Sequence, residues 1–224
     1  MSPLFALFQT VALAAAPAPT PTQMFSDSGW MFDSDVNTGA GTVHIYSRSI
    51  QGVPCFKATA TTNVAAERMF EVVTGIPATP GWSSAGVTEA ELLGRTSDSL
   101  EFYEYLDLPG WTLVNDRFWF LRGSTSVKEP GKIIFQWERL VGGGSHSARF
   151  QQVKSKHPSA VEPPINVGGW HFVGTNPVEI RYFICSDTGG SVPQAVQTMA
   201  TRRTLPDTVS DVILEARRRN DQSR

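Results

Sequence analysis

The stretch VEIRYFICSDTGGSVPQAVQTMATRRTLPDTVSDVILEARR, residues 178–218, contains a predicted strand and a predicted long helix. β-Branched and aromatic residues fill residues 178–185, which is typical of a strand. Gly189-Gly190 then breaks the chain, Ser191 is a helix-capping residue, and helical sequence follows to about Arg218. At ~1.5 Å per residue such a helix is about 35 Å long, enough to cross a whole sheet.

Pro206 lies inside this predicted helix. A proline in a helix interior removes one backbone hydrogen bond, and its ring clashes with the preceding turn. We therefore expect the helix to kink or to divide in two at this residue. The part after the proline has one apolar face at helical spacing, formed by Val209, Val212, Ile213 and Ala216.

The chain before this stretch is dominated by further predicted strands. Short turns rich in Gly, Pro, Asn, Asp and Ser separate them, which favours an antiparallel sheet over β–α–β units. Together with the strand that opens the quoted stretch, the predicted strands are Thr42–Ile50, Val53–Thr61, Gly86–Gly94, Leu100–Leu106, Thr112–Arg122, Lys132–Val141, Val167–Val173 and Val178–Cys185.

One other helix is predicted, with Asn63 as its N-cap and Gly75 at its end. Its apolar residues share one helical face: Ala66, Met69, Phe70 and Val73. Two helices against so many strands leave much of one sheet face to the C-terminal helix. The sequence therefore predicts an α+β fold, a curved antiparallel sheet closed by a long C-terminal helix, and such an arrangement tends to enclose space for a ligand.

Composition and charge fit a folded domain with a sizeable core. Of the 224 residues 41% are hydrophobic and 18% are charged, and the net charge of −2 provides no basic field for nucleic acid. We interpret the one basic run, Arg217-Arg218-Arg219, as cations at a helix C-terminus, the alternative being a weak contact with anionic lipid. Cys55 and Cys185 are expected to be two separate half-buried thiols. A single bridge is the alternative if the first strands pair with the last one.

The N-terminus resembles a secretory signal peptide. Residues 4–16 are apolar and end in small residues suited to cleavage, and a Pro/Ala/Thr spacer follows at 17–22. No Lys or Arg precedes the apolar stretch, which is too short to span a bilayer. We expect residues 1–23 to be a cleaved signal peptide or a disordered tail, 24–219 to be one ligand-binding domain, and 220–224 to be a tail. Export is favoured over a cytoplasmic location.

Several motifs follow one another after residue 30. They are Val43-x-Ile45-Tyr46-Ser47-Arg48, Phe56-Lys57-Ala58, Glu67-x-x-Phe70-Glu71-Val72-Val73, Trp82, Gly168-Gly169-Trp170, Asp187-x-x-Gly190-Ser191-x-Pro193 and Leu205-Pro206. Their order and spacing resemble the StAR-related lipid-transfer (START) family of the helix-grip superfamily, most strongly towards the C-terminus. The resemblance implies a hydrophobic tunnel between the sheet and the C-terminal helix. Such a tunnel would carry a sterol, phospholipid or related lipid without catalysis.

The sequence departs from the START pattern at two polar positions. START domains often carry an Arg-Asp pair on a middle strand, whereas this chain reads Asp116-Arg117. The arginine usual before the Gly-Gly-Trp strand is absent, since the sequence there is Pro163-Pro164-Ile165-Asn166. Polar ligand contacts are therefore not carried over from the family.

We expect a set of aromatic, apolar and polar side chains to contact the ligand. Arg117 and Glu138 are the predicted inward polar groups, which would pair with each other or orient a ligand head group. The complete set is Arg117, Trp119, Trp137, Glu138, Trp170, Met199, Val209 and Ile213.

No catalytic residue, cofactor or metal site is predicted. The chain has no nucleophile elbow, zinc-protease motif or phosphate loop, and Asp33–Gly39 reads as a polar turn rather than a calcium loop. The alternative is a helix-grip enzyme of the cyclase or hydrolase type acting on an apolar substrate. It would need an ionisable residue inside the cavity, and the candidates are Glu104, Arg117, Glu138 and His171. A third possibility is an interaction module with a filled core.

The expected partners are a lipid or other apolar small molecule and, transiently, a membrane. The loop Pro109-Gly110-Trp111 is a candidate for the membrane contact because tryptophan favours the interface between water and lipid. We expect a monomer that binds no nucleic acid.

Overall fold

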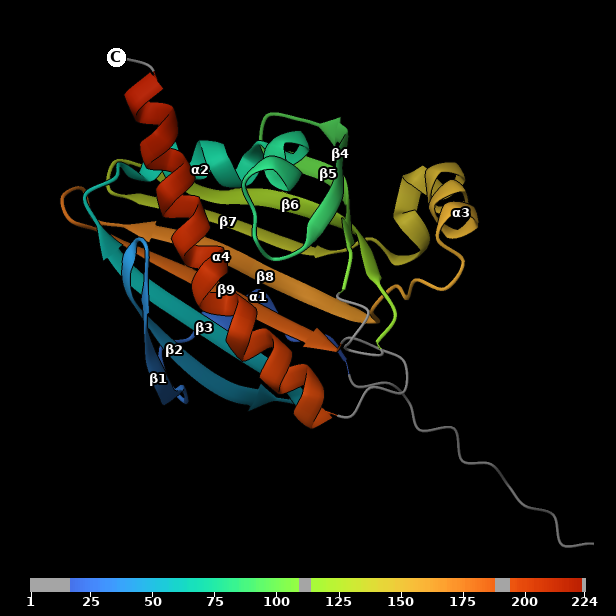
Figure 1. Cartoon of the computed structure of the whole chain (residues 1–224), viewed down its shortest axis with the longest axis horizontal. Helices are drawn as coiled ribbons and strands as arrows, with labels where there is room; N and C mark the ends of the chain where they lie inside the picture. Colours follow the sequence, from blue (N-terminus) through green and yellow to red (C-terminus); the bar gives the residue numbers. More distant parts are fainter. Residues whose placement is uncertain (1–16, 109–113, 188–193, 223–224) are drawn as a thin grey trace, which may run out of the picture.

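A computed structural model describes residues 17–108, 114–187 and 194–222, apart from the side chains of 194–202. Nine strands form one antiparallel sheet in the order β1-β2-β3-β9-β8-β7-β6-β5-β4. The sheet curves around the long helix α4 (Figure 1), which confirms the predicted α+β fold.

The strands are β1 Met31–Thr38, β2 Gly41–Ile50, β3 Val53–Thr62, β4 Val87–Arg95, β5 Ser99–Leu106, β6 Arg117–Glu129, β7 Lys132–Arg139, β8 Ile165–Val173 and β9 Val178–Asp187. The helical segments are α1 Pro21–Phe25, α2 Ala66–Thr74, η1 Ile76–Gly81, η3 Val141–His146, α3 Ser147–Lys156 and α4 Gln194–Gln222.

An early and a late strand meet in the middle of the sheet. β3 pairs with β9, and this register places Cys55 directly opposite Cys185. The two cysteines are joined by a disulfide and have no exposed surface. The expectation of two separate thiols is therefore wrong. The spacing of the cysteines along the chain does not encode the strand pairing that brings them together.

The helix α4 covers one face of the sheet, which we call the inner face (Figure 1). The predicted apolar face of the helix is confirmed, since Val209, Val212, Ile213 and Ala216 have no exposed surface. The helix is not divided at Pro206, because it runs unbroken from Gln194 to Gln222. A carboxylate oxygen of Asp211 accepts hydrogen bonds from the backbone N–H and the hydroxyl of Ser84, both at 2.7 Å, and so ties α4 to the segment before β4.

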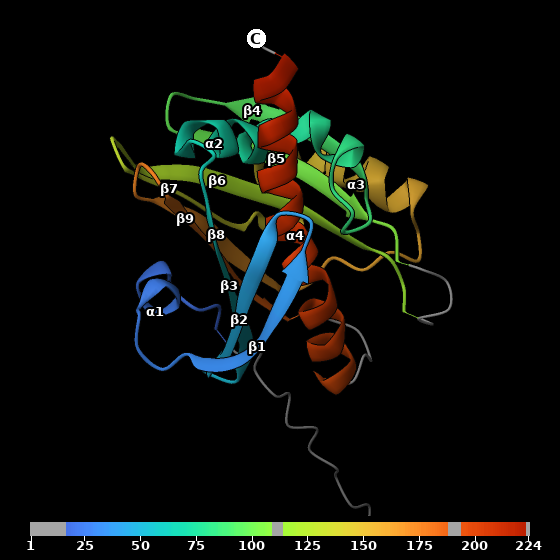
Figure 2. The same cartoon turned by 60° about the vertical axis from the view of Figure 1, so that its left-hand side comes forward.

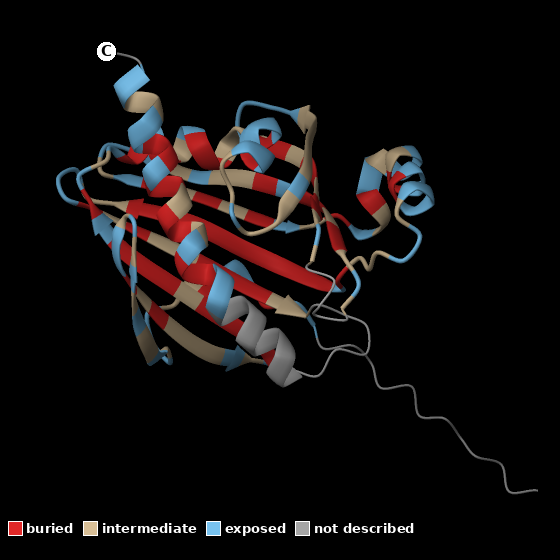
Figure 3. Cartoon of the chain, viewed as in Figure 1, coloured by how far each residue is buried: buried red, intermediate tan, exposed pale blue. Residues whose placement is uncertain are grey.

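The opposite, outer face of the sheet is covered by shorter elements. The helix α1 lies on the other side of the strands from α4 (Figure 2), and its Met24 packs with Phe183 and the two cysteines. Its N-cap Thr20 and Gln23 form a capping box, which satisfies backbone N–H groups at the start of this helix. Both faces of the central strand β8 are therefore covered, and Figure 3 shows it buried along almost its whole length.

Several elements were missed in the sequence, and the longest of them are β1 and α3. Asp33–Gly39 was expected to be a turn, but residues 31–38 form the edge strand β1. An edge strand forms backbone hydrogen bonds with only one neighbouring strand, and it commonly carries polar side chains. Few apolar residues in its sequence therefore indicate a strand. The helix α3 was missed because it buries only Phe150 and Val153 among polar residues.

Two boundaries also differ from those predicted. Ala65, not Asn63, lies at the N-cap of α2, and no side chain caps that end. Strand β6 begins at Arg117 and continues to Glu129, later than the predicted Thr112–Arg122. Pairing with β5 and β7 sets the length of this strand, and local sequence does not specify such pairing.

Gly168 and Gly169 of β8 leave room for aromatic rings on both faces of the sheet. A Cβ atom on Gly168 would lie 2.1 Å from Cζ2 of Trp137 on the inner face. A Cβ atom on Gly169 would lie 2.6 Å from Cζ of Phe25 in α1 on the outer face. The Gly-Gly-Trp motif is therefore a packing requirement of this strand.

Replacing Gly168 by alanine will lower the free energy of unfolding by about 1–3 kcal/mol, because the added methyl group overfills the core. The methyl group would displace the indole of Trp137, and the carbonyl oxygen of Phe183, at 2.6 Å, blocks retreat in another direction. Urea unfolding measures the loss. Gly94→Ala is the matched control, since its Cβ would meet nothing closer than 3.9 Å. Equal stability of the two variants would contradict this account.

Candidate functional site

The inner face of the sheet is largely aromatic and aliphatic. Because side chains alternate along a strand, every second residue of the central strands faces α2 and α4. These residues belong to one hydrophobic core with the apolar face of α4. From β5, β7 and β8 they are Leu100, Phe102, Ile133, Phe135, Trp137, Trp170 and Phe172.

Glu104 is a carboxyl group on this apolar face. It shares the orientation of Leu100 and Phe102, and it lies opposite Ala90 on β4 and Trp119 on β6. Within the described part of the chain it makes no hydrogen bond or ion pair. Burial raises the pKa of Glu104 to about 7, although part of its surface stays accessible. An accessible carboxyl group surrounded by apolar side chains is the arrangement expected of a group that faces a ligand.

Two further polar groups of the inner face have no hydrogen-bond partner among the residues that the structure describes. The indole N–H of Trp119 is buried and has no hydrogen-bond partner, and the hydroxyl of Tyr182 on β9 makes no hydrogen bond with the described residues. By contrast, Trp137 donates its indole N–H to Asn166 Oδ1 at 2.9 Å. Within the described part of the chain, the indole N–H of Trp119 is thus an exception to the rule that buried polar groups are paired.

The curvature of the sheet brings Glu104 and Tyr182 towards each other. They lie on β5 and β9, which are four strands apart and would be about 19 Å apart on a flat sheet. Yet the pKa of Tyr182 is raised first by burial and then by the charge of Glu104. The ring of Tyr182 also packs on Trp170, with ring centroids 4.4 Å apart, and stacks on Trp137 at 5.8 Å.

Arg117 is buried at the start of β6, as predicted, but Glu138 is not its partner. The guanidinium of Arg117 donates to the carbonyl oxygens of Asn115 and Asp116, and burial lowers its pKa. Side chains alternate between the two faces along β7, and the neighbouring Trp137 faces inward. Glu138 therefore faces the outer side, where it is exposed. The prediction that Glu138 points inward is wrong, and this residue is removed from the candidate site.

His171 is buried on the outer face rather than inside. Its ring lies between Phe25 of α1, at 4.3 Å, and Phe183, at 4.9 Å. Its Nε2 has no partner in the described residues. Burial first, and then the charges of Arg181 and Lys132, lower the pKa of His171 to about 4. It therefore cannot serve as the interior ionisable group of an enzyme.

The structure brings most of the other predicted contacts to the inner face. Trp119, Trp137 and Trp170 pack in or against its core, and Val209 and Ile213 cover it from α4. The side chain of Met199 and the loop Pro109-Gly110-Trp111 lie outside the described residues. Whether these residues bind a ligand stays a prediction.

Sequence reasoning missed Tyr182 and ranked Glu104 below Arg117. The alternation of Leu100, Phe102 and Glu104 along β5 already puts the carboxyl group on the apolar face. This alternation can be read from the sequence. It does not say which face is the inner one, because both faces of the sheet are covered by other elements and carry apolar residues.

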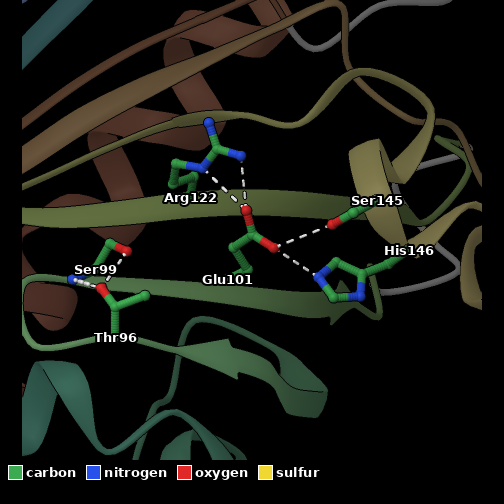
Figure 4. Close-up of polar contacts among 6 residues, drawn as sticks. All are labelled: Thr96, Ser99, Glu101, Arg122, Ser145 and His146. Carbon is green, nitrogen blue, oxygen red and sulfur yellow. Dashed lines mark hydrogen bonds and ion pairs between the residues drawn. The ribbon is translucent and has the colours of Figure 1, made fainter.

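The outer face carries a polar cluster that includes His146 (Figure 4). One carboxylate oxygen of Glu101 accepts from the guanidinium of Arg122, at 2.7 and 3.0 Å, and the other contacts His146 Nε2 at 2.7 Å and Ser145 Oγ at 3.3 Å. In a catalytic triad the histidine would lie between the serine and the acid. Here the serine and the histidine both contact the acid, so the cluster anchors η3 to β5.

The described residues indicate no second histidine-based site and no metal site. His157 contacts a second carboxylate, Glu89, so His146 and His157 do not form one site. No group of three potential metal ligands occurs in residues 17–108, 114–187 and 194–222. Within the same ranges, none of the helices combines the length and apolar character that a bilayer-spanning helix needs.

Comparisons with known proteins agree on the fold. No protein-family model matches the chain, and no curated protein matches its sequence. A STAR-related lipid transfer protein from Xanthomonas axonopodis is 21% identical with a TM-score of 0.64, over 85% of this chain and 99% of that one. Human STARD10 is 16% identical with a TM-score of 0.70, over 92% of this chain and 83% of that one.

An enzyme shares the same architecture. The Zhui aromatase/cyclase from Streptomyces sp. R1128 is 12% identical with a TM-score of 0.53, over 75% of this chain and 95% of that one. These likenesses show that the chain has the START, or helix-grip, fold. At such low identity they carry the fold and not the activity.

Proposed function

We propose that this protein binds an apolar molecule of the lipid class between the inner face of the sheet and α4, and that it does so without catalysis. The supporting observation is a set of inward polar groups, Glu104, Trp119 and Tyr182, inside an aromatic and aliphatic lining. None of the three has a hydrogen-bond partner among the described residues. Groups of this kind in an apolar site fix the orientation of a bound ligand. The START fold shared with the STAR-related lipid transfer protein from Xanthomonas axonopodis supports the same function.

The physical basis of binding is the withdrawal of apolar surface from water. Each buried methylene group contributes about 0.8 kcal/mol, so a lipid is retained only where a cover closes over it. The helix α4 is that cover, because Val209 and Ile213 pack on the inner core and Asp211 holds the helix to Ser84.

Protein purified from its host will carry an apolar ligand that organic extraction and mass spectrometry detect. Reproducibly empty protein that also fails to take up fluorescent sterols and phospholipids would contradict the proposed function. The Cys55–Cys185 disulfide supports export, because intracellular thiols are kept reduced. N-terminal sequencing of the same sample tests this second point, since a chain that begins at Met1 or Ser2 has not been processed.

The second candidate function is an enzyme on the same fold. One observation favours it: a carboxyl group with a pKa near 7 is suited to proton transfer at neutral pH. An enzyme would lose turnover in Glu104→Gln while it retained its ligand. A carrier would return the extracted ligand chemically unchanged from both the wild type and this variant.

A further inference from the structure

The segment that contains α1, residues 20–30, lies on the outer face of the sheet, and we call it the strap (Figure 2). Its helix has five residues, too few to persist in water without tertiary contacts. Met24 has no exposed surface and packs with the two cysteines. The ring of Phe25 occupies the space beside Gly169, where a Cβ atom would lie 2.6 Å from the ring. Two apolar side chains therefore hold the strap on the sheet.

A polar tether also fastens the strap, and this tether does not depend on pH. The guanidinium of Arg48 on β2 donates to the carbonyl oxygens of Gln23, Met24 and Ser28. Cζ of Arg48 lies 4.2 Å from the centroid of the Trp30 ring. An arginine stays protonated under all conditions in which proteins fold, and carbonyl oxygens do not titrate. The tether is therefore the same at pH 8 and at pH 5.

His171 is a titratable group directly under the strap. Its ring lies between those of Phe25 and Phe183, and its buried Nε2 has no partner among the described residues. A protonated imidazole carries an N–H donor on both ring nitrogens. With the strap closed, the proton at Nε2 would be a charged donor that is unpaired and shielded from water, which is costly. Displacement of Phe25 would let water reach this atom.

The charged groups around His171 disfavour its protonation in the closed strap. Arg181 lies opposite it on β9, and Lys132 lies on β7. The nearby acids pair with Arg181: Glu179 at 2.6 Å, and the exposed Asp27 of the strap at 3.7 Å. Burial first, and then the charges of Arg181 and Lys132, lower the pKa of His171 from 6.5 to about 4, against a smaller opposite effect of Asp27.

We propose that the strap is an acid-sensitive latch: protonation of His171 displaces Phe25, the strap leaves the outer face, and the apolar strip beneath it becomes accessible together with the Cys55–Cys185 disulfide. The residues of this strip are Val53, Ile165, Val167 and Phe183. The sheet itself stays folded, because β8 and β9 remain paired with β7 and β3 and the inner core remains covered by α4. The latch acts on the face opposite the proposed lipid site, so it does not rest on the proposed function.

Hydrogen exchange at the Met24 amide of the full chain measures the opening of the strap. This N–H donates to the carbonyl oxygen of Thr20 at 2.9 Å, and the released helix would not keep that bond. His171 has its ordinary pKa of 6.5 in the open strap, as against about 4 in the closed one. The opening constant should therefore rise about 30-fold from pH 8 to pH 5. The protection factor, corrected for the intrinsic pH dependence of exchange, should fall by that factor, while amides of β8 and β9 stay much better protected.

Variants assign the response to the latch. His171→Gln and His171→Phe cannot acquire the charge, so the protection of the Met24 amide should be nearly the same at both pH values. Phe25→Ala removes the cover and should raise the pKa of His171 towards 6.5, as followed by NMR of its ring. His44→Gln, at a half-exposed histidine on β2, is the matched control and should keep the full response. Asp27→Asn should also keep it.

Three results would overturn the proposal. The first is a wild-type protection factor that does not change between pH 8 and pH 5. The second is a response that persists in both His171 variants or disappears in Asp27→Asn, since either outcome assigns the acid dependence to another group. The third is equal protection of the strap and of β9, because the strap would then open only when the whole domain unfolds.

Discussion

A variant with both Cys55 and Cys185 replaced by alanine will unfold with a free energy about 2–5 kcal/mol lower than the oxidised wild type. The disulfide closes a loop of 130 residues, and on the chain-entropy account a loop of this length approaches the top of that range. The bond also fastens β3 to β9, the pairing that joins the first strands of the chain to the last one. Guanidinium unfolding under non-reducing conditions measures the change.

Two comparisons make this test specific. The wild type unfolded with a reductant present should match the double variant, because both then lack the crosslink. If the double variant and the oxidised wild type unfold at the same denaturant concentration, the bond does not form in solution. That result would also remove the support that the disulfide gives to export.

Replacing Glu104 by glutamine will stabilise the protein at pH 8 and leave its stability nearly unchanged at pH 4. Folding raises the pKa of Glu104 from 4.5 to about 7. The folded protein therefore binds a proton that the unfolded chain has released between these values, and stability falls as the pH rises through that interval. At pH 8 the charged form costs about 3 kcal/mol, which the neutral amide avoids. Urea unfolding of both proteins across this pH range measures the effect.

Glu101 provides a control of opposite sign on the same strand. Its hydrogen bond with Arg122, and then that with His146, lower the pKa of Glu101. Its contribution to stability is therefore present above its unfolded pKa and is lost as the pH falls. Glu101→Gln should destabilise the protein at pH 8 and much less at pH 3. A stabilisation of Glu104→Gln that does not depend on pH would contradict the assignment of Glu104 as a buried acid.

Much of the fold was predictable because its signals are local. The strands Gly41–Ile50 and Val53–Thr62 and the apolar face of α4 agree with the sequence to within a residue or two. β1 and α3 were missed for the opposite reason. An edge strand and a helix with two buried residues carry little periodic apolar signal, and pairing with neighbours stabilises them instead.

The site was less predictable than the fold. Three of the tryptophans were expected on the inner face and lie there, whereas Glu138 and His171 point to the other side. Both faces of this sheet are covered, by α4 on one side and by α1 and α3 on the other. Alternation along a strand separates the residues of two faces but does not say which face encloses the ligand.

The sequence by itself determined most of the strands, the long last helix with its apolar face, and the antiparallel sheet, because each depends on residues close together in the chain. Only the tertiary structure decided that Cys55 meets Cys185, that Gly168 makes room for Trp137, and that Glu104 and Tyr182 share one interior. These relations depend on strand register and on the curvature of the whole sheet. Both arise from contacts between residues distant in the chain, and no short stretch of sequence specifies them.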